Sequence, residues 1–151
     1  MTNQIQKIQK LRVTTGLGVK DCQELLEETS GDFDKALKIA QERGASIAQK
    51  KAQRQTTKGL IDCYVHQGKI GVLLELACET DFVARNEVFK ELAHDLSMQI
   101  ASMAPKDRAE LLKQPFIKDE TKTVKDVVEA AIAKTGENIV VKRFVRYQLG
   151  E

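Results

Sequence analysis

The sequence predicts an α+β protein: three short helices, then a core in which a three-stranded antiparallel sheet packs with helices. Three observations predict this class. Apolar residues recur at helical spacing in about the first 45 residues. Two runs with strand character flank a short glycine-containing loop after residue 60. A basic stretch without acids lies between Glu42 and Asp62 and marks a boundary. We therefore expect a helical docking module over 1–53 and an α+β core over 54–151.

The module is predicted to hold three helices. Gly16 and Gly18 permit a tight turn after the first helix, the second should end near residues 30–31, and Asp32 is positioned to cap the third. The GLG run lacks a preceding strand and a Gly-Lys-Ser/Thr ending, so it predicts a turn rather than a phosphate loop. A bundle of this size has no room for an enclosed site and is typical of docking modules. The inward residues are expected to be Ile5, Ile8, Leu11, Val19, Cys22, Leu25, Leu26, Phe33, Ala36, Leu37 and Ala40.

The core is predicted to begin with a β-hairpin. Residues 60–66 and 70–77 are its strands, and Gln67-Gly68-Lys69 is its loop. One face of the second strand carries Ile70, Val72, Leu74 and Leu76. Leu73 and Ala77 lie on the other face, so we expect both faces of the sheet to be at least partly covered.

Two helices and a last strand complete the predicted core. Asn86 can cap the first helix and Pro105 lies beyond its end. The second runs from about Val124 to Lys134 and closes at Gly136. The final segment, ENIVVKRFVRYQLGE, reads as a long strand with a bulge near residues 142–144. The buried faces are expected to hold Phe89, Leu92, Ala93, Leu96, Ile100, Met103, Val124, Val127, Val128, Ala131 and Ile132.

Composition limits the function. Charged residues are 30% and hydrophobic residues 42%, which is typical of soluble globular proteins. No apolar run approaches the roughly 18 residues of a membrane helix, and the polar start is no signal peptide, so we expect a cytoplasmic protein without a membrane partner. Cys22, Cys63 and Cys78 have no metal-site spacing and are expected to be small, partly buried hydrophobes. No metal site and no cofactor are predicted.

Catalytic motifs are missing as well. His66 and His94 are the two histidines, and Cys63 lies three residues before His66, which in a strand points the pair to opposite faces. The sequence contains no HExxH, GxSxG or Walker A motif. We therefore expect a binding protein and not an enzyme.

Residues 78–89, CETDFVARNEVF, place the acid Asp81 beside the ring of Phe82 at a strand-to-helix corner. In one interpretation Phe82 joins the core and Asp81 is a helix N-cap. In the other, Val83 and Ala84 anchor the segment, and the corner presents the acid and the ring to a partner. The residues alone favour the first interpretation and leave the second open.

The basic stretch leaves a further alternative open. The net charge is only +2, yet five cations lie between residues 42 and 62: Arg43, Lys50, Lys51, Arg54 and Lys58. They fit a solvated connector or helix tail, or a contact with phosphates or an acidic surface. A basic RNA-binding accessory protein of translation is therefore the second candidate function.

Several segments together resemble one family. Residues 75–86, ELACETDFVARN, closely resemble the signature of the elongation factor Ts family. Members of this family are nucleotide exchange factors of the GTPase elongation factor Tu. LRVTTGLGVKDCQELLEETSGDFDKA resembles the family's ubiquitin-associated-like bundle, and GASIAQKKAQR its basic tail. QPFIKDETKTV and GENIVVKRFVRYQLGE resemble its closing segment. Nearly the whole chain is covered, and it is similar to the short bacterial-type members.

The resemblance implies a guanine-nucleotide exchange factor. In the family the Asp-Phe pair, here Asp81 and Phe82, inserts into the GTPase domain near the Mg²⁺ and nucleotide. Arg12 and Lys51 match contact positions on the same partner, in its GDP-bound and nucleotide-free forms. The chain departs from the family at two contact positions, since many members carry His at Gln99 and the methionine pair of the N-terminal turn is Val19-Lys20. No direct nucleic-acid contact is implied.

The resemblance also bears on assembly. About ten residues separate Met103 from Pro115, so the helical hairpin and most of the second subdomain of long members are missing. A single three-stranded sheet leaves edges and a face that tend to be covered, and short members imply a homodimer through the sheets. Lys142, Arg143 and Arg146 oppose this, because like charges repel when brought together.

Overall fold

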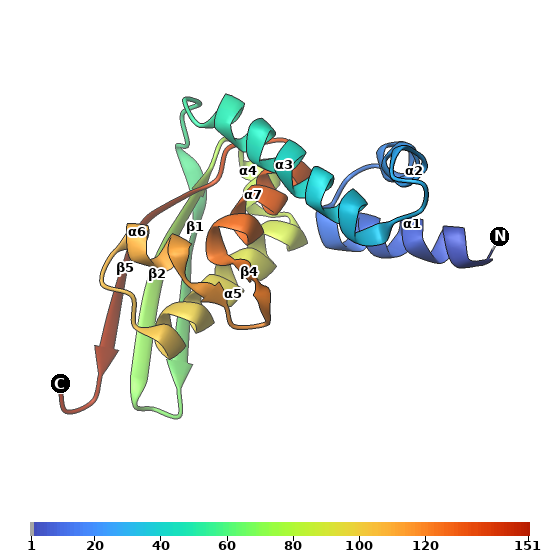
Figure 1. Ribbon diagram of the computed structural model, residues 1–151. Helices are drawn as coiled ribbons and strands as arrows, with labels where there is room; N and C mark the ends of the chain where they lie inside the picture. The colour runs from blue at the N-terminus through green and yellow to red at the C-terminus, as the bar shows by residue number, and fades with distance from the viewer. Residues whose placement is uncertain (1) are drawn as a thin grey trace.

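Three helices precede a three-stranded antiparallel sheet that packs with further helices, which confirms the predicted α+β class (Figure 1). The computed structural model describes residues 2–151. The helices are α1 (Thr2–Thr15), α2 (Val19–Glu28), α3 (Phe33–Lys51), α4 (Asp81–Ala84), α5 (Glu87–Met103), α6 (Arg108–Lys113) and α7 (Val124–Thr135). The strands are β1 (Lys58–His66), β2 (Ile70–Cys78), β3 (Pro115–Phe116), β4 (Asp119–Thr123) and β5 (Val140–Gln148). None of the helices in this part of the chain is long and apolar enough to cross a membrane.

The module has the predicted turns and cap. Gly16 has φ +73°, a conformation that favours glycine, and it ends the first helix. Asp32 caps α3, because its carboxylate accepts a hydrogen bond from the backbone N–H of Lys35 at 3.1 Å. A small separate core holds the three helices together and contains Leu11, Cys22, Leu25, Leu26, Ala36 and Ala40.

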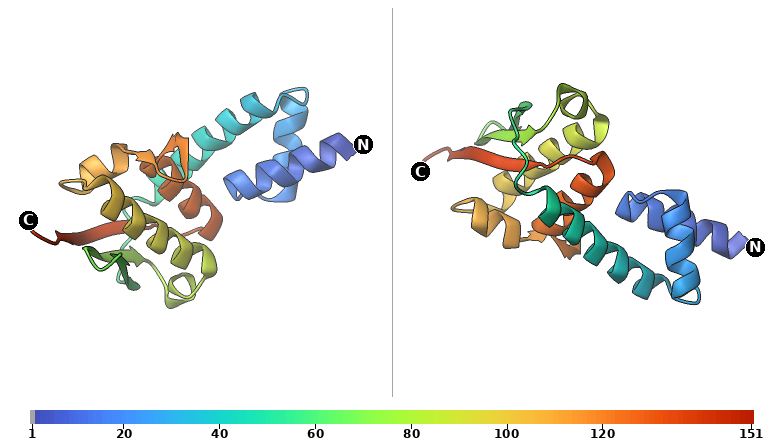
Figure 2. Two further views of the ribbon diagram at one scale, coloured as in Figure 1. Left: turned by 90° about the horizontal axis from the view of Figure 1, so that it is seen from below. Right: turned by 90° about the horizontal axis from the view of Figure 1, so that it is seen from above.

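Helix α3 connects the module to the core. It continues through the first part of the basic stretch, so Arg43, Lys50 and Lys51 lie on a helix tail, whereas residues 52–57 connect α3 to β1. Ala48 near its end is buried in the hydrophobic cluster of the core, and α3 runs alongside α7 (Figures 1 and 2). Because one helix belongs to both parts, the boundary after residue 53 stays a prediction.

The sheet has the order β1-β2-β5 with antiparallel pairing throughout. The hairpin loop is Gln67-Gly68-Lys69, as predicted; Gln67 and Gly68 both have positive φ values, +51° and +68°, and the N–H of Lys69 donates to the carbonyl of His66 at 2.9 Å. The register between β2 and β5 shifts at Glu75 and Leu76, which face Arg143 and Val141 and leave Lys142 as the extra residue. The predicted bulge in the last strand is confirmed.

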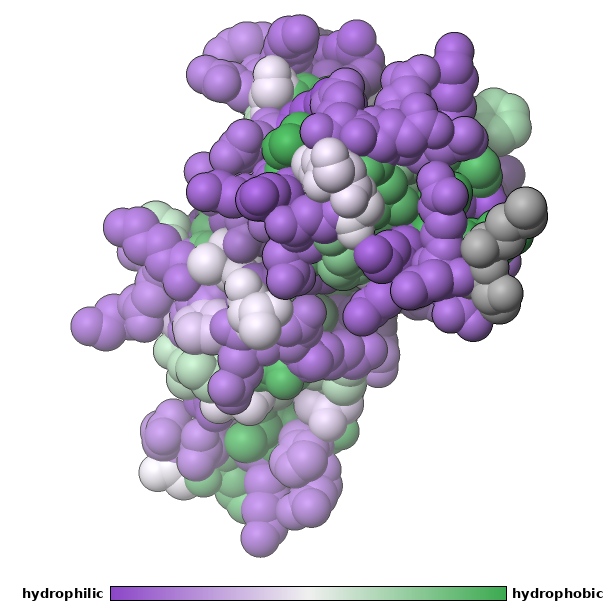
Figure 3. All heavy atoms as spheres, turned by 45° about the vertical axis from the view of Figure 1, so that its right-hand side comes forward, coloured by the Kyte–Doolittle hydropathy of each residue, from purple (hydrophilic) through white to green (hydrophobic). Residues whose placement is uncertain are grey.

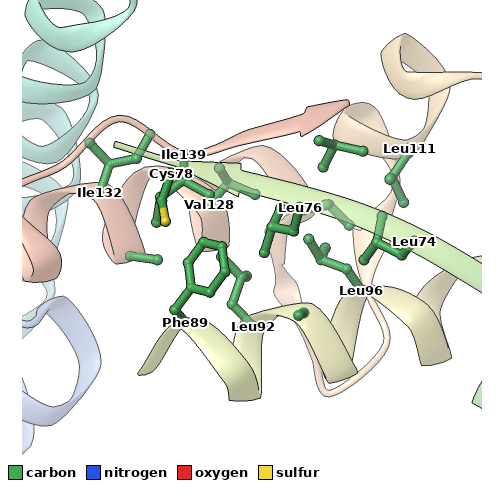
Figure 4. Close-up of a cluster of buried hydrophobic side chains, with 14 of the residues drawn as sticks. Leu74, Leu76, Cys78, Phe89, Leu92, Leu96, Leu111, Val128, Ile132 and Ile139 are labelled. Atoms are coloured by element: carbon green, nitrogen blue, oxygen red, sulfur yellow. The ribbon is translucent and has the colours of Figure 1, made fainter. Parts of the chain in front are cut away.

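Helices α5 and α7 cover one face of the sheet. In Figure 4, Phe89, Leu92 and Leu96 point from α5 toward side chains of β2, with residues of α7 beside them. Two residues expected in this core are not buried there: Met103 is 43% exposed at the helix end, and Val127 is only partly buried. The fully buried large side chains of the core are Leu74, Leu76, Phe89, Leu96, Gln99, Ile100, Leu111 and Val124.

The opposite face of the sheet is covered only at one end, where Ala77 is 5% exposed, and its centre is open, so the expected cover holds for Ala77 but not for Leu73. Leu73 is 51% exposed, and its neighbours Ile61, Val65 and Val145 are exposed as well. In the register of the sheet these four side chains alternate with the buried ones and therefore lie on one side. We call this surface the outer sheet face.

Three short elements between α5 and α7 were not predicted. Helix α6 and the β3–β4 ladder fill the stretch between α5 and α7. A six-residue helix and a two-residue strand are too short to show a hydrophobic period, so their position depends on tertiary packing.

The cysteines differ in environment. Cys22 and Cys78 are buried, as expected, but Cys63 is exposed on the outer sheet face, which corrects its expected burial. Burial raises the pKa of the Cys78 thiol to about 11, and the negative charge of Glu137 acts in the same direction. Burial also raises the pKa of Cys22.

We expect Cys78 to give the protein a pH-dependent stability. The unfolded chain loses this proton near the ordinary value of 9.0, whereas the folded chain keeps it to about 11. The unfolded state then binds fewer protons in this window, so the free energy of unfolding should fall as the pH rises from 9 to 11. Urea titrations of the protein and of Cys78→Ala across this range measure the effect. Parallel pH profiles for the two proteins would contradict it.

Candidate functional site

The most exposed large apolar side chain at a structured corner is Phe82. Strand β2 ends at Cys78, Thr80 caps the single turn of α4, and Phe82 on that turn is 90% exposed. Val83 and Ala84 are buried beneath it, each 8% exposed. The interpretation of Phe82 as a core residue was therefore wrong, and the corner presents the ring to solvent.

The cap of α4 explains how the acid is also presented. The side-chain oxygen of Thr80, not of Asp81, accepts the hydrogen bond from the N–H of Val83, at 3.4 Å. Asp81 is thus the first residue of the helix rather than its N-cap, and its side chain is exposed. The corner places a carboxylate and an aromatic ring side by side on the surface.

The other predicted contact residues are spread over the module and the core. Arg12 is exposed in the last turn of α1, and Val19 is 50% exposed at the start of α2. Lys51 lies at the end of α3, where its ammonium group donates to the carbonyl oxygen of Gly136 at 2.6 Å. Figure 3 shows a face on which hydrophilic residues predominate and hydrophobic ones form small patches, as on a surface that meets solvent in the free protein.

Gln99 has a different environment. Its side chain is fully buried, and its amide donates to Gln114 and to the carbonyl of Pro115 and accepts from the N–H of Ile117. These bonds tie α5 to the β3–β4 ladder. A contact between Gln99 and a partner stays a prediction, and this geometry does not support it.

Sequence reasoning missed residues that hold the corner. Glu137, in the loop after α7, accepts hydrogen bonds from the segment before α4, and Glu79 accepts one from Asn138. These partners are 57 to 59 residues apart along the chain, so no spacing in the sequence indicates them.

The cavities do not suggest catalysis. A pocket of about 160 Å³ lies between α3 and α7. Ala40, Val127 and Glu129 are among its lining residues, and burial raises the pKa of Glu129 while Lys125 opposes the shift. Across residues 2–151, no group of three or more His, Cys, Asp or Glu side chains could hold a metal ion. The presented corner remains the candidate site, and its chemistry is that of a protein contact.

Comparison with known proteins identifies the family. The family model described as elongation factor TS matches residues 79–151. Elongation factor Ts of Thermotoga maritima is 44% identical over 188 aligned residues, which cover 95% of this chain and 94% of the relative. The chain belongs to the elongation factor Ts family. Other elongation factor Ts proteins are 40% identical, with 97% of this chain covered for Thermodesulfovibrio yellowstonii and 99% for Rubrobacter xylanophilus.

The family assignment fixes the class of function. Elongation factor Ts is the nucleotide exchange factor of elongation factor Tu, and it is not an enzyme. The alignments span 188 to 195 positions, whereas this chain has 151 residues, so these elongation factor Ts relatives contain positions without a counterpart here. The short connection between α5 and α7 fits the place that the sequence predicts for this difference.

Proposed function

We propose that the chain accelerates GDP release from elongation factor Tu by inserting Asp81 and Phe82 beside the Mg²⁺ and nucleotide site of the GTPase. The observation that supports this most is the 90% exposure of Phe82 on a corner whose neighbours Val83 and Ala84 are buried. An exposed ring on a fixed turn gains free energy when a partner buries it, at roughly 1.5–3 kcal/mol for a full Phe side chain.

The mechanism needs no chemistry from this chain. Mg²⁺ requires near-ideal octahedral oxygen ligands and bridges the nucleotide phosphates of GTPases. A buried Phe82 stabilises a displaced conformation of the surrounding loops, and the Asp81 carboxylate disturbs the water and side-chain network of the metal. The phosphates are then held less tightly. Linkage makes the effect reciprocal, so GDP weakens the binding of the factor by the same ratio.

The module supplies the anchor in this proposal. Arg12 and Val19 are exposed on α1 and α2, and the helices of the module are separate elements from the corner formed by α4 (Figure 2). They can contact the GTPase without taking part in the displacement of Mg²⁺. Lys51 and Arg54 of the basic stretch contact the core through Gly136 and Glu79, so no observation favours the RNA-binding alternative.

Release of a fluorescent GDP analogue from elongation factor Tu tests the proposal. The chain should accelerate release, and excess Mg²⁺ should reduce the acceleration. Release at the spontaneous rate would refute it. A titration with RNA over a salt series is the parallel measurement for the alternative, where tight binding with a steep salt slope and no GDP release would favour that function.

We also propose that two copies pair through the outer sheet face. This face exposes Ile61, Val65, Leu73 and Val145, and an apolar surface of this kind on a sheet tends to be covered. The charge that opposes pairing is reduced, because the guanidinium of Arg143 on this face pairs with Glu75 at 2.7 Å. A two-fold axis would place the same residues on both sides of the contact.

Leu73→Lys is expected to separate the copies. Leu73 is central on the face, and a two-fold contact would bring two unpaired ammonium groups together, which costs several kcal/mol and weakens association by about a hundredfold or more. Sedimentation equilibrium should show twice 16.9 kDa for the protein and 16.9 kDa for the variant. Leu149→Lys, at an exposed leucine beyond β5, is the matched control. A single 16.9 kDa species for the unmodified protein at micromolar concentration would defeat the proposal.

A further inference from the structure

The corner that presents Phe82 is held by a carboxylate from a distant loop. One oxygen of Glu137 accepts hydrogen bonds from the backbone N–H groups of Glu79, at 3.1 Å, and Thr80, at 2.9 Å. Its other oxygen accepts from the hydroxyl of Thr80 at 2.7 Å. A single side chain thus engages three donors on the two residues that precede α4.

This contact also determines the cap of α4. The Thr80 hydroxyl has one hydrogen, and it donates that hydrogen to Glu137. Its lone pairs therefore face the N–H of Val83, from which it accepts at 3.4 Å. Glu137 fixes the rotamer of Thr80, and Thr80 in turn orients the single turn on which Phe82 lies. A one-turn helix has too few internal hydrogen bonds to hold its own direction.

The loop that carries Glu137 also donates a hydrogen bond to the corner, and it is bonded to the end of α3 and the residues that follow it. Glu79 accepts from the N–H of Asn138 at 2.7 Å, and Asn138, which is 4% exposed, donates its side-chain N–H to the carbonyl of Arg54 at 3.0 Å. Arg54 lies 3.7 Å from the Glu79 carboxylate. Lys51 donates to Gly136 at 2.6 Å. The loop over residues 136–138 therefore joins the docking helix to the presented corner.

We propose that Glu137 is a positioning residue for nucleotide exchange, which acts by holding Thr80 and through it the direction of Phe82. This inference rests on the proposed role of Phe82. Glu137 does not touch the partner in this assignment. Its effect is to keep the ring in the orientation that enters the GTPase, so that the ordering of the corner is complete before the two proteins meet.

Glu137→Gln tests the assignment, because the amide keeps the size of the side chain and replaces one acceptor oxygen by a donor. GDP release from elongation factor Tu is measured against the concentration of factor. We expect the maximal rate to fall about tenfold, in the range typical of residues coupled to a site through a network. The half-saturating concentration should change by less than about twofold, since the anchoring residues are untouched.

A general loss of folded protein would give a different result. It lowers the active concentration, which raises the half-saturating value and leaves the maximal rate unchanged, and that outcome would overturn the proposal. Thr80→Val removes the hydroxyl and keeps the branched shape, so it should reproduce the fall in maximal rate. Glu129→Gln, the same change at a partly buried position of α7, is the matched control and should leave both values unchanged.

Hydrogen exchange of the free protein separates this proposal from the proposed function. In Glu137→Gln the amide protons of Glu79, Thr80 and Val83 should exchange faster, while those of β2 and β5 keep their protection. Unchanged protection at these three amides would overturn the positioning role, whatever the GTPase assay shows. If the unmodified chain does not accelerate GDP release from elongation factor Tu, the proposed function is wrong. The hydrogen-exchange measurement alone then still decides whether Glu137 holds the corner.

Discussion

Phe82→Ala should slow GDP release from elongation factor Tu by about thirtyfold or more relative to the unmodified chain. A loss of this size is typical of an aromatic residue at the centre of a protein contact, where truncation costs about 2 kcal/mol or more. The free energy of unfolding should change by no more than about 0.5 kcal/mol, because the ring is 90% exposed in the free protein. Stopped-flow release of fluorescent GDP and urea titration measure the two effects.

The GDP release rate and the unfolding free energy of Phe82→Ala each have an outcome that would contradict the role of Phe82. A loss of several kcal/mol in unfolding free energy would mean that the ring is part of the core, contrary to its exposure. Unchanged release with unchanged stability would mean that Phe82 does not enter the partner. Asp81→Asn tests the acid separately, since it removes the charge and leaves the ring in place.

Phe89→Ala, seven residues further along, should have the opposite profile. Phe89 is fully buried, and its ring points from α5 into the cluster formed with Cys78 of β2 and with α7 (Figure 4). Truncating a buried Phe costs about 3–5 kcal/mol, because apolar contact is lost and a cavity remains. In a chain of this length that lowers the melting temperature by roughly 10 °C.

The same substitution at two positions makes each variant the control of the other. Below its melting transition, Phe89→Ala should retain much of the maximal GDP release rate, because the corner and the anchoring residues are intact. A melting temperature within about 2 °C of the unmodified protein would contradict the placement of Phe89 in the core.

Most of the helices and strands could be predicted because they depend on local signals. Asp32 and Asn86 accept backbone hydrogen bonds in the turn that follows them, and Gly136 adopts the positive φ that ends α7. The Gln67-Gly68 turn needs two residues with positive φ. These requirements involve neighbours within about four residues, so the sequence itself displays them.

Side chains whose surroundings come from distant segments could not be predicted in the same way. Met103 fits the helical period of α5 but is 43% exposed at the last residue of that helix, and Gln99 is buried with hydrogen bonds to Pro115 and Ile117 at the β3–β4 ladder, which showed no period. Leu73 alternates like a buried strand residue, yet the chain provides no layer over its face. Hydrophobic pattern reports which side chains favour burial and not whether a layer is available to bury them.

The fold class, the hairpin, the bulge and the resemblance that the comparisons confirmed could all be predicted from the amino-acid sequence, because each is encoded in contiguous residues. The residue pattern favoured a core Phe82 and the family resemblance favoured a presented one; the tertiary structure settles its environment, because the ring is 90% exposed. The burial of Val83 and Ala84 leaves the adjacent ring no space on the core side of a one-turn helix. It also revealed Glu137 at the corner. The free energy of such contacts depends on distances in space, and a sequence separation of 57 residues hides them from any local pattern.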